Sequence, residues 1–260
     1  MSIEANKKMN KQASILFVHG AGHAAWCWRD HFTGWFEARG YTVAAPDLPH
    51  HGSLPRRGLT FTPLSAYIDT VAQAAASLEP PLILIGHSMG GFIIQKYLER
   101  AEADLAVLLA STPPTGASSF VKRMAIRRPL AFFNTMRTGN ATDSPERTRD
   151  YFFHADTPDE VVNRCHQRLR PESMRALMDM MSALHPERVS TPVVVIGAEG
   201  DWLVAPPDEL EATARAYRTT PLTLPGGHDM MLDIPWQRVA TEIETAIVER
   251  VPLLARGVEK

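Results

Sequence analysis

The sequence predicts an α/β protein with a mostly parallel central sheet, helices on both faces of the sheet and a helical insertion. Three observations carry this prediction. Six short apolar runs alternate with longer segments of helical periodicity, and several runs lack polar alternation, which is typical of strands buried on both faces. A Gly-x-Ser-x-Gly motif directly follows one apolar run and precedes a helical pattern. Residues 113–190 then interrupt the alternation with helical patterns alone.

The apolar runs define the expected strands, which lie at residues 15–18, 42–45, 82–85, 105–109, 193–196 and 222–224. Helical patterns lie between and after them at residues 26–39, 63–78, 89–100, 207–217 and 235–250. Thr62 before Pro63, and Asp233 ahead of Pro235, supply the chemistry of a helix start. Alternation of this kind gives a parallel sheet whose ligand site lies at the carboxyl ends of the strands.

The interruption predicts a helical cap, residues 113–190, inserted into a core formed by residues 12–112 and 191–251. Residues 1–11 are expected to form a polar N-terminal tail. Helices are expected at residues 158–169 and 171–181, the first opened by a capping box with proline at its first position. We expect the cap to form a lid over the strand ends. Its methionines suit an adaptable apolar pocket, and packing of the lid onto the core is the alternative.

Composition limits the class of partner. The chain has 260 residues, of which 45% are hydrophobic and 22% charged, as in a soluble globular protein. A formal charge of −2 and a pI near 6.6 argue against a general nucleic-acid binder and favour small or neutral partners. The sequence shows neither a signal peptide nor an apolar run long enough for stable membrane insertion, so we expect a cytoplasmic protein.

Cysteine usage points away from disulfides and metals. Cys27 and Cys165 are too few for a disulfide framework, and no spacing of cysteine and histidine matches a zinc site. No metal and no organic cofactor is expected. The oligomeric state is not fixed by the sequence.

Ser88 is the candidate nucleophile. It lies in the sequence Gly-His-Ser-Met-Gly, residues 86–90, between an expected strand and an expected helix. Glycines two residues before and two after a serine permit the strained turn that exposes its hydroxyl. The following helix directs its N-terminal amides at this hydroxyl, so the N–H of Met89 is a candidate donor to an oxyanion. An ordinary serine in a glycine-rich turn is the alternative, but it leaves the order of strand, motif and helix unexplained.

A serine nucleophile needs a histidine as base and a carboxylate that orients the histidine, and in folds of this kind the chain order is serine, acid, histidine. The loops after the last two strands carry Asp201 and His228. Glycines before His228 let its loop approach Ser88. Asp201 is preferred over Glu199 and Asp179 because it lies farther along the loop beyond its strand end.

The turn after the first strand is expected to supply a second oxyanion donor. The N–H of Ala21 is the first choice and that of Gly22 the weaker candidate. The residues expected to line the substrate pocket are Gly22, His23, His87, Met124, Met178, Met181, Trp202 and Met230.

These residues carry a family resemblance. Residues 19–28, His-Gly-Ala-Gly-His-Ala-Ala-Trp-Cys-Trp, resemble a segment of the plant methylesterase and hydroxynitrile lyase branch of the α/β-hydrolases. Residues 86–91 are similar to the motif of bacterial esterases and lysophospholipase-like members. The resemblance covers nearly the whole chain and implies the α/β-hydrolase fold. It also implies a triad of Ser88, Asp201 and His228, with oxyanion amides from Ala21 and Met89.

Two residues narrow the range of expected reactions. Asp229 follows the candidate base where hydroxynitrile lyases of this branch carry a lysine, which argues against cyanohydrin cleavage. A serine at the turn argues against dehalogenases and epoxide hydrolases, which use an aspartate there.

The expected activity is hydrolysis of small to medium, largely apolar carboxylic esters through an acyl-enzyme. The same triad also serves C–C bond hydrolysis, lysophospholipase-like cleavage and perhydrolysis, and some proteins of this fold keep it as ligand receptors. Pocket polarity discriminates among them, because a C–C hydrolase needs cationic or polar groups for a substrate carboxylate. The basic run at residues 122–128 could meet an anionic head group, although a solvated helix face is the favoured interpretation.

Overall fold

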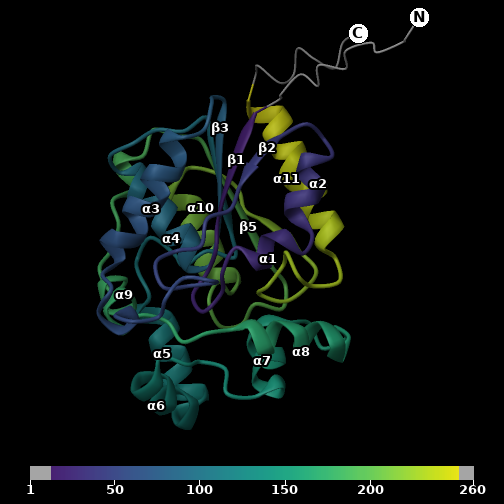
Figure 1. Ribbon diagram of the computed structural model, residues 1–260. Helices are drawn as coiled ribbons and strands as arrows, with labels where there is room; N and C mark the ends of the chain where they lie inside the picture. The colour runs from purple at the N-terminus through teal and green to yellow at the C-terminus, as the bar shows by residue number, and fades with distance from the viewer. Residues whose placement is uncertain (1–12, 252–260) are drawn as a thin grey trace, which may run out of the picture.

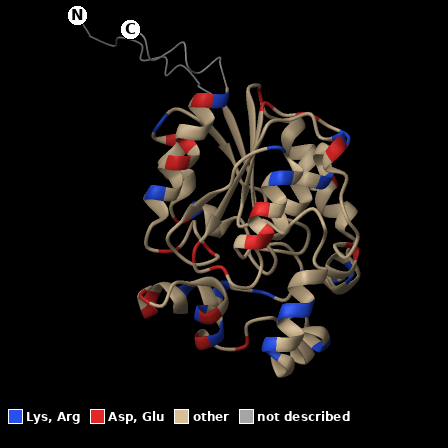
Figure 2. Ribbon diagram, turned by 180° about the vertical axis from the view of Figure 1, so that it is seen from behind, with Lys and Arg blue, Asp and Glu red and all other residues tan. Residues whose placement is uncertain are grey.

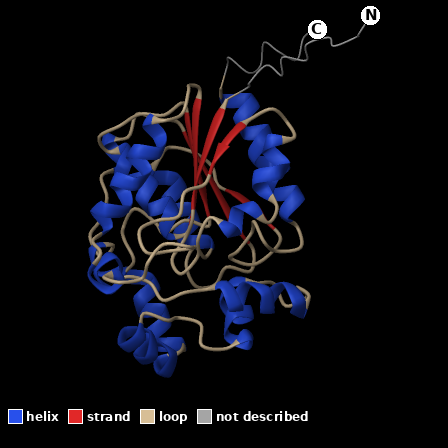
Figure 3. Cartoon of the chain, in the orientation of Figure 1, coloured by secondary structure: helices blue, strands red, loops and turns tan. Residues whose placement is uncertain are grey.

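Six parallel strands form the centre of the structure, in the order β2-β1-β3-β4-β5-β6. The computed structural model describes residues 13–251, so the predicted tail, residues 1–11, lies outside the described residues. The strands are β1 (Ser14–Val18), β2 (Thr42–Ala44), β3 (Leu82–His87), β4 (Leu105–Leu109), β5 (Val193–Ala198) and β6 (Leu222–Leu224). Every predicted strand is present, and Figure 3 shows helices on both sides of the sheet. The predicted fold class is confirmed.

Alternate residues of each strand enter different cores. Phe17 and Ile85 pack on one face with α1 (Trp26–Arg29), α2 (Phe32–Glu37) and α11 (Trp236–Arg250). Leu16 and Leu84 pack on the other face with α3 (Leu64–Ala76), α4 (Met89–Leu98) and α10 (Pro207–Ala216), as Figure 1 shows. The strands contain no lysine, arginine, aspartate or glutamate, and charged residues lie on the surrounding helices and loops (Figure 2). The sheet is therefore an apolar layer buried on both faces.

Residues 113–190 are helical, as predicted, and within them the structure describes no strand. Their helices are α5 (Ser118–Arg127), α6 (Pro129–Thr138), α7 (Pro145–Phe152), α8 (Asp159–Arg168), α9 (Met174–Asp179) and the 3₁₀ turn η2 (Pro186–Arg188); η1 (Leu59–Phe61) lies outside this segment. Helices α5 to α8 lie beyond the carboxyl ends of the strands (Figure 1). We call residues 113–190 the inserted segment; its role as a separate lid stays a prediction.

One predicted helix, residues 26–39, is wrong as a single element. The structure divides it into α1 and α2, with His31 at φ −140° and ψ −58° between them. The aromatic rings of Trp28 and Phe32 both pack on Phe17, at centroid distances of 4.6 and 6.0 Å. This packing is a tertiary contact, and local helical periodicity carries no information about it.

Two further features concern the chain as a whole. Within residues 13–251, no helix combines the length and the apolar character needed to cross a membrane. Cys27 and Cys165 are both buried and free.

Candidate active site

Ser88 stands between β3 and α4 with φ 54° and ψ −120°, a left-handed φ that is costly for any residue other than glycine. The flanking glycines make this turn possible. A Cβ at Gly86 would lie 2.6 Å from the carbonyl oxygen of Gly90, and a Cβ at Gly90 would lie 2.2 Å from the carbonyl oxygen of Val18. Side chains at either position would therefore collide with backbone. The expected strand, strained turn and helix are all present.

His228 and Asp201 form a buried pair beside this turn. His228 Nδ1 lies 2.6 Å from Asp201 Oδ2. The same carboxylate accepts backbone hydrogen bonds from the three residues Leu203, Val204 and Ala205, at 2.9 to 3.1 Å. These contacts fix the carboxylate and leave Nε2 of His228 without a hydrogen-bond partner among the described residues. The structure places Asp201 against His228, whereas Glu199 is exposed and Asp179 contacts Leu64 and Arg175.

The pair has opposite shifts of pKa. Burial alone would lower the pKa of His228, but the charge of Asp201 and its hydrogen bond outweigh burial and raise this pKa above 6.5. Burial would raise the pKa of Asp201, but the charge of His228 and the hydrogen bonds lower it below 3.8. Asp201 is thus ionised at neutral pH and stabilises a proton on His228.

Ser88 and His228 line the same cavity. Within the described part of the chain, the Ser88 hydroxyl makes no hydrogen bond to His228. Both side chains are therefore accessible from one cavity.

The backbone around Ala21 and Met89 provides donors at this cavity, which both residues line. The Ala21 N–H has no hydrogen-bond partner among residues 13–251. The Met89 N–H belongs to the first residue of α4, where a helix leaves its amides without a partner in the helix. The Gly22 N–H, by contrast, donates to Glu172 Oε2 at 3.1 Å. Of the two predicted donors after β1, the geometry thus favours Ala21.

Four of the predicted pocket residues line the cavity: Gly22, His23, His87 and Met124. His87 is a buried neighbour of Ser88, and burial together with the charge of His228 lowers its pKa to about 3. Its Nε2 lies 3.1 Å from the carbonyl oxygen of His228. A neutral His87 therefore supports the loop of His228 and does not compete with it as a base.

The other four predicted pocket residues are wrong. Met178 and Met181 are 67% and 45% exposed, because α9 turns Ala176 and Met180 inward instead. Trp202 lines a separate hollow with two arginines of the inserted segment and Asp150. Met230 is fully buried in the core on the side of α11.

The cavity wall that sequence reasoning missed comes mostly from the inserted segment. Apolar side chains on α5, α6, α7 and α9, and on the residue directly after α9, line it; they include Phe120, Phe132, Met136, Tyr151, Phe152, Leu177 and Met180. Helical spacing would have selected Leu177 and Met180 over Met178, because the buried Ala176 marks their face of α9. No comparable signal marks Tyr151 and Phe152, which end the otherwise polar helix α7.

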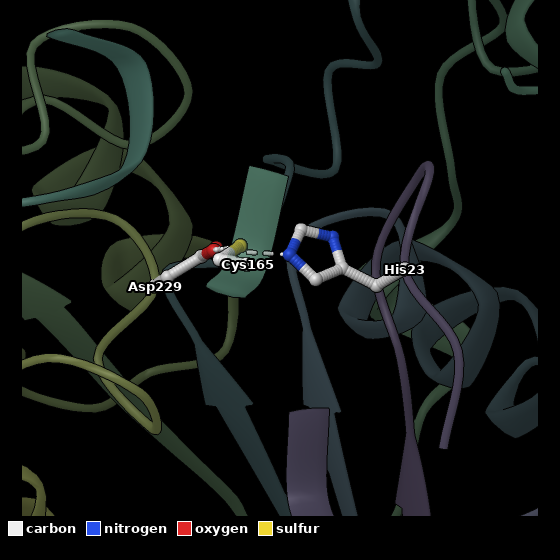
Figure 4. A group of neighbouring side chains, drawn as sticks. All are labelled: His23, Cys165 and Asp229. Carbon is white, nitrogen blue, oxygen red and sulfur yellow. Dashed lines mark hydrogen bonds and ion pairs between the residues drawn. The ribbon is translucent and has the colours of Figure 1, made fainter. Parts of the chain in front are cut away.

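Two buried groups have ligand atoms near enough to be considered as metal sites, and both contain Asp229. One adds His23 and Cys165 (Figure 4), and the other adds His87 and His228. His23 Nε2 lies 2.9 Å from Asp229 Oδ2, which is shorter than the roughly 3.3 Å between two ligands of one tetrahedral zinc ion. A hydrogen bond between these two atoms accounts for that distance. Cys165 donates to the same oxygen at 3.7 Å, so the first group is a hydrogen-bonded cluster and we assign no metal to it.

Comparison with known proteins bears on fold and family. The sequence model of a family described as "Alpha/beta hydrolase family" matches residues 15–242. Norfluorocurarine synthase 2 from a Strychnos species is 34% identical over 165 residues, which are 61% of this chain and only 58% of that protein. The pFDCC methylesterase MES16 of Arabidopsis thaliana is 29% identical over 206 residues, which are 73% of this chain and 77% of that protein.

Solved structures share the fold. The crystal structure of methylesterase MES16 from Arabidopsis superposes with a TM-score of 0.69 at 23% identity, covering 90% of this chain and 98% of that one.

Proposed function

Since this chain belongs to the alpha/beta hydrolase family, we propose that it hydrolyses carboxylic esters of small to medium, largely apolar molecules. One observation carries the proposal: Ser88 on its strained turn and the His228 and Asp201 pair open onto one cavity with a mainly apolar wall. The similarity to a methylesterase supports methyl esters as the first compounds to test.

In the proposed mechanism, Ser88, His228 and Asp201 act as a catalytic triad. His228 Nε2 takes the proton of Ser88 as its Oγ attacks the ester carbonyl, and the N–H groups of Ala21 and Met89 hold the resulting oxyanion. The intermediate collapses to an acyl-enzyme, and the alcohol leaves with the proton from His228. Water then attacks the acyl group, gives a proton to His228 and releases the acid, and Ser88 regains its proton.

Pocket polarity favours the ester over the other reactions of such a triad. Apart from histidines, Arg170 and Glu172 are the charged residues among the described residues that line the cavity. Arg170 donates to the backbone carbonyls of Gln167 and Leu169, and Glu172 accepts from four donors. Arg170 is thus the one lining cation apart from histidine among the described residues, and its Nη1 already donates to two backbone carbonyls. The wall suits apolar acyl or alcohol groups.

The test is hydrolysis of p-nitrophenyl esters from acetate to palmitate, together with methyl esters of apolar acids, by wild type and Ser88→Ala. We expect kcat to fall by a factor of at least about a thousand in the variant. Ser111→Ala is the matched control, because Ser111 is also buried near the start of α4 but its hydroxyl bonds to Thr112 and Gln95. Equal activity of Ser88→Ala and wild type would contradict the proposal. Binding of apolar esters without turnover by wild type would indicate a ligand receptor instead.

A further inference from the structure

One peptide group at the cavity, the one that joins Ala21 to Gly22, is held from both sides. Its carbonyl oxygen, on Ala21, lies 3.0 Å from His23 Nδ1. Its N–H, on Gly22, donates to Glu172 Oε2 at 3.1 Å. The next carbonyl, that of Gly22, accepts from the N–H of Arg170 at 2.9 Å. This loop therefore has little freedom to rotate about its backbone bonds.

Both ring nitrogens of His23 face acceptor atoms, so the ring is held at each of its two nitrogens. Nδ1 faces the carbonyl oxygen of Ala21, and Nε2 faces Asp229 Oδ2 at 2.9 Å (Figure 4). The side chains of His23 and Asp229 are 1% and 0% exposed, so their contact is fully buried. Burial would raise the pKa of Asp229, but the charge of His23 and its hydrogen bond lower it below 3.8. The carboxylate of Asp229 thus holds one nitrogen of the His23 ring, and the other nitrogen contacts the Ala21 carbonyl.

Glu172 is fixed as firmly on the other side. Besides the Gly22 N–H, its carboxylate accepts from His51 Nε2 at 3.1 Å, from the Tyr67 hydroxyl at 2.8 Å and from the Ser173 N–H at 2.6 Å. Its side chain is 4% exposed. Hydrogen bonds from these four donors hold the carboxylate in one position. Glu172 thus ties the inserted segment to the loop after β1.

We propose that Asp229, acting through His23, and Glu172 are positioning residues that fix the Ala21–Gly22 peptide and thereby aim the Ala21 N–H at the oxyanion. Because the Gly22 N–H is bound to Glu172, the Ala21–Gly22 peptide cannot turn toward the cavity. The N–H of Ala21, one residue earlier, stays free. The inference rests on the proposed function, because an oxyanion forms only if Ser88 attacks a carbonyl. It assigns to the residue after the base, and to a residue of the inserted segment, a part in transition-state binding.

The test compares Asp229→Asn and Glu172→Gln with wild type, using esters and a trifluoromethyl ketone of matched chain length. Ser88 Oγ adds to the ketone carbonyl, its proton passes to His228, and the carbonyl oxygen becomes an oxyanion in the same place as in the reaction. We expect kcat per active site, titrated with a phosphonate, and affinity for the ketone to fall together by about 10- to 100-fold. KM and affinity for the product acid should stay within about twofold, because they do not involve the oxyanion.

Two further variants isolate the effect. Asp179→Asn is the matched control, since Asp179 also lies in the inserted segment and accepts from a core amide, that of Leu64, but does not touch this peptide. If Asp229→Asn fails to fold because it leaves His23 buried without its carboxylate partner, His23→Leu combined with Asp229→Leu removes both polar groups together, and we expect the same loss of kcat. Rates are compared on the plateau above the acid limb, because Asp229 also raises the pKa of His228.

The outcomes separate this inference from the proposed function. Wild-type kcat and ketone affinity in Glu172→Gln and in the Asp229 variants would overturn the positioning role. A lower melting temperature with unchanged kcat per titrated site would also overturn it, since that is the result of a purely structural role. If wild type itself neither cleaves esters nor binds the ketone, the proposed function fails instead.

Discussion

Burial and the Asp201 carboxylate act on His228 in opposite directions, and the carboxylate prevails. As the proposed base, His228 works only when it is neutral, and a raised pKa keeps it protonated to higher pH. We therefore expect the acid limb of kcat/KM to have its midpoint above pH 6.5, measured by ester hydrolysis from about pH 5 to about pH 9. Asp201→Asn should move the midpoint to lower pH and reduce kcat by roughly ten-thousand-fold. A midpoint below 6.5 in wild type would show that desolvation prevails.

The glycines around Ser88 lead to a second prediction at the scale of single residues. In Gly90→Ala the new Cβ would lie 2.2 Å from the Val18 carbonyl oxygen, so the free energy of unfolding should fall by at least about 3 kcal/mol. Gly34→Ala is the control, because a Cβ at this exposed position in α2 would meet no atom within 4 Å. It should raise the free energy of unfolding by about 0.5 to 1 kcal/mol. Urea denaturation measures both, and equal effects would contradict the steric argument.

At the scale of elements, Asp233 joins the inserted segment to the loop that carries His228. Its carboxylate accepts from the Gly227 N–H at 2.7 Å, from the Thr157 hydroxyl at 2.5 Å and from the His154 N–H at 3.1 Å. Asp233→Ala leaves these donors without their acceptor and should lower the free energy of unfolding by about 3 kcal/mol. Thr157→Val removes one of the donors with little change of shape, and about 1 kcal/mol is expected. Thermal denaturation of both variants checks this order of stability. A larger loss of stability in Thr157→Val than in Asp233→Ala would contradict it.

The strands were the most predictable elements, because the central ones are apolar runs buried on both faces. The run at residues 105–109 has the predicted bounds, and β3 and β5 each extend two residues past their predicted ends. Strand order along the chain also sufficed to bring Asp201 and His228 together, since both follow strands that end at one edge of the sheet.

Contacts between distant segments could not be predicted. The choice of Met180 over Met178 at the cavity depends on which face of α9 meets the core, and two methionines in one helix do not state this. The four partners of Glu172 come from three separate parts of the chain and from its own neighbour. Nothing in the local sequence distinguishes this glutamate from an exposed one.

At the scale of the whole molecule, the cavity lies between the strand ends and the inserted segment. Met124 of α5 is 1% exposed and lines it. Met124→Trp should fill part of the cavity and shift the optimum of a p-nitrophenyl ester series toward shorter acyl chains, with kcat/KM for the longest ester reduced by roughly tenfold or more. Met178→Trp changes the same residue type at a site that is 67% exposed, and its chain-length profile should match wild type. A shift in Met178→Trp, or none in Met124→Trp, would contradict this assignment of the wall.

The division of the cavity between the strand ends and the inserted segment has a consequence for the evolution of substrate preference. The proposed catalytic groups come from loops at the strand ends, whereas most of the cavity wall comes from residues 113–190. Inherited changes in that segment can thus alter which compound is accepted while the reacting atoms stay the same. Two hydrogen bonds limit how far the segment can change. Glu172 accepts from the Gly22 N–H, and the Thr157 hydroxyl donates to Asp233. A segment grafted from a relative would have to bring equivalents of both residues with it.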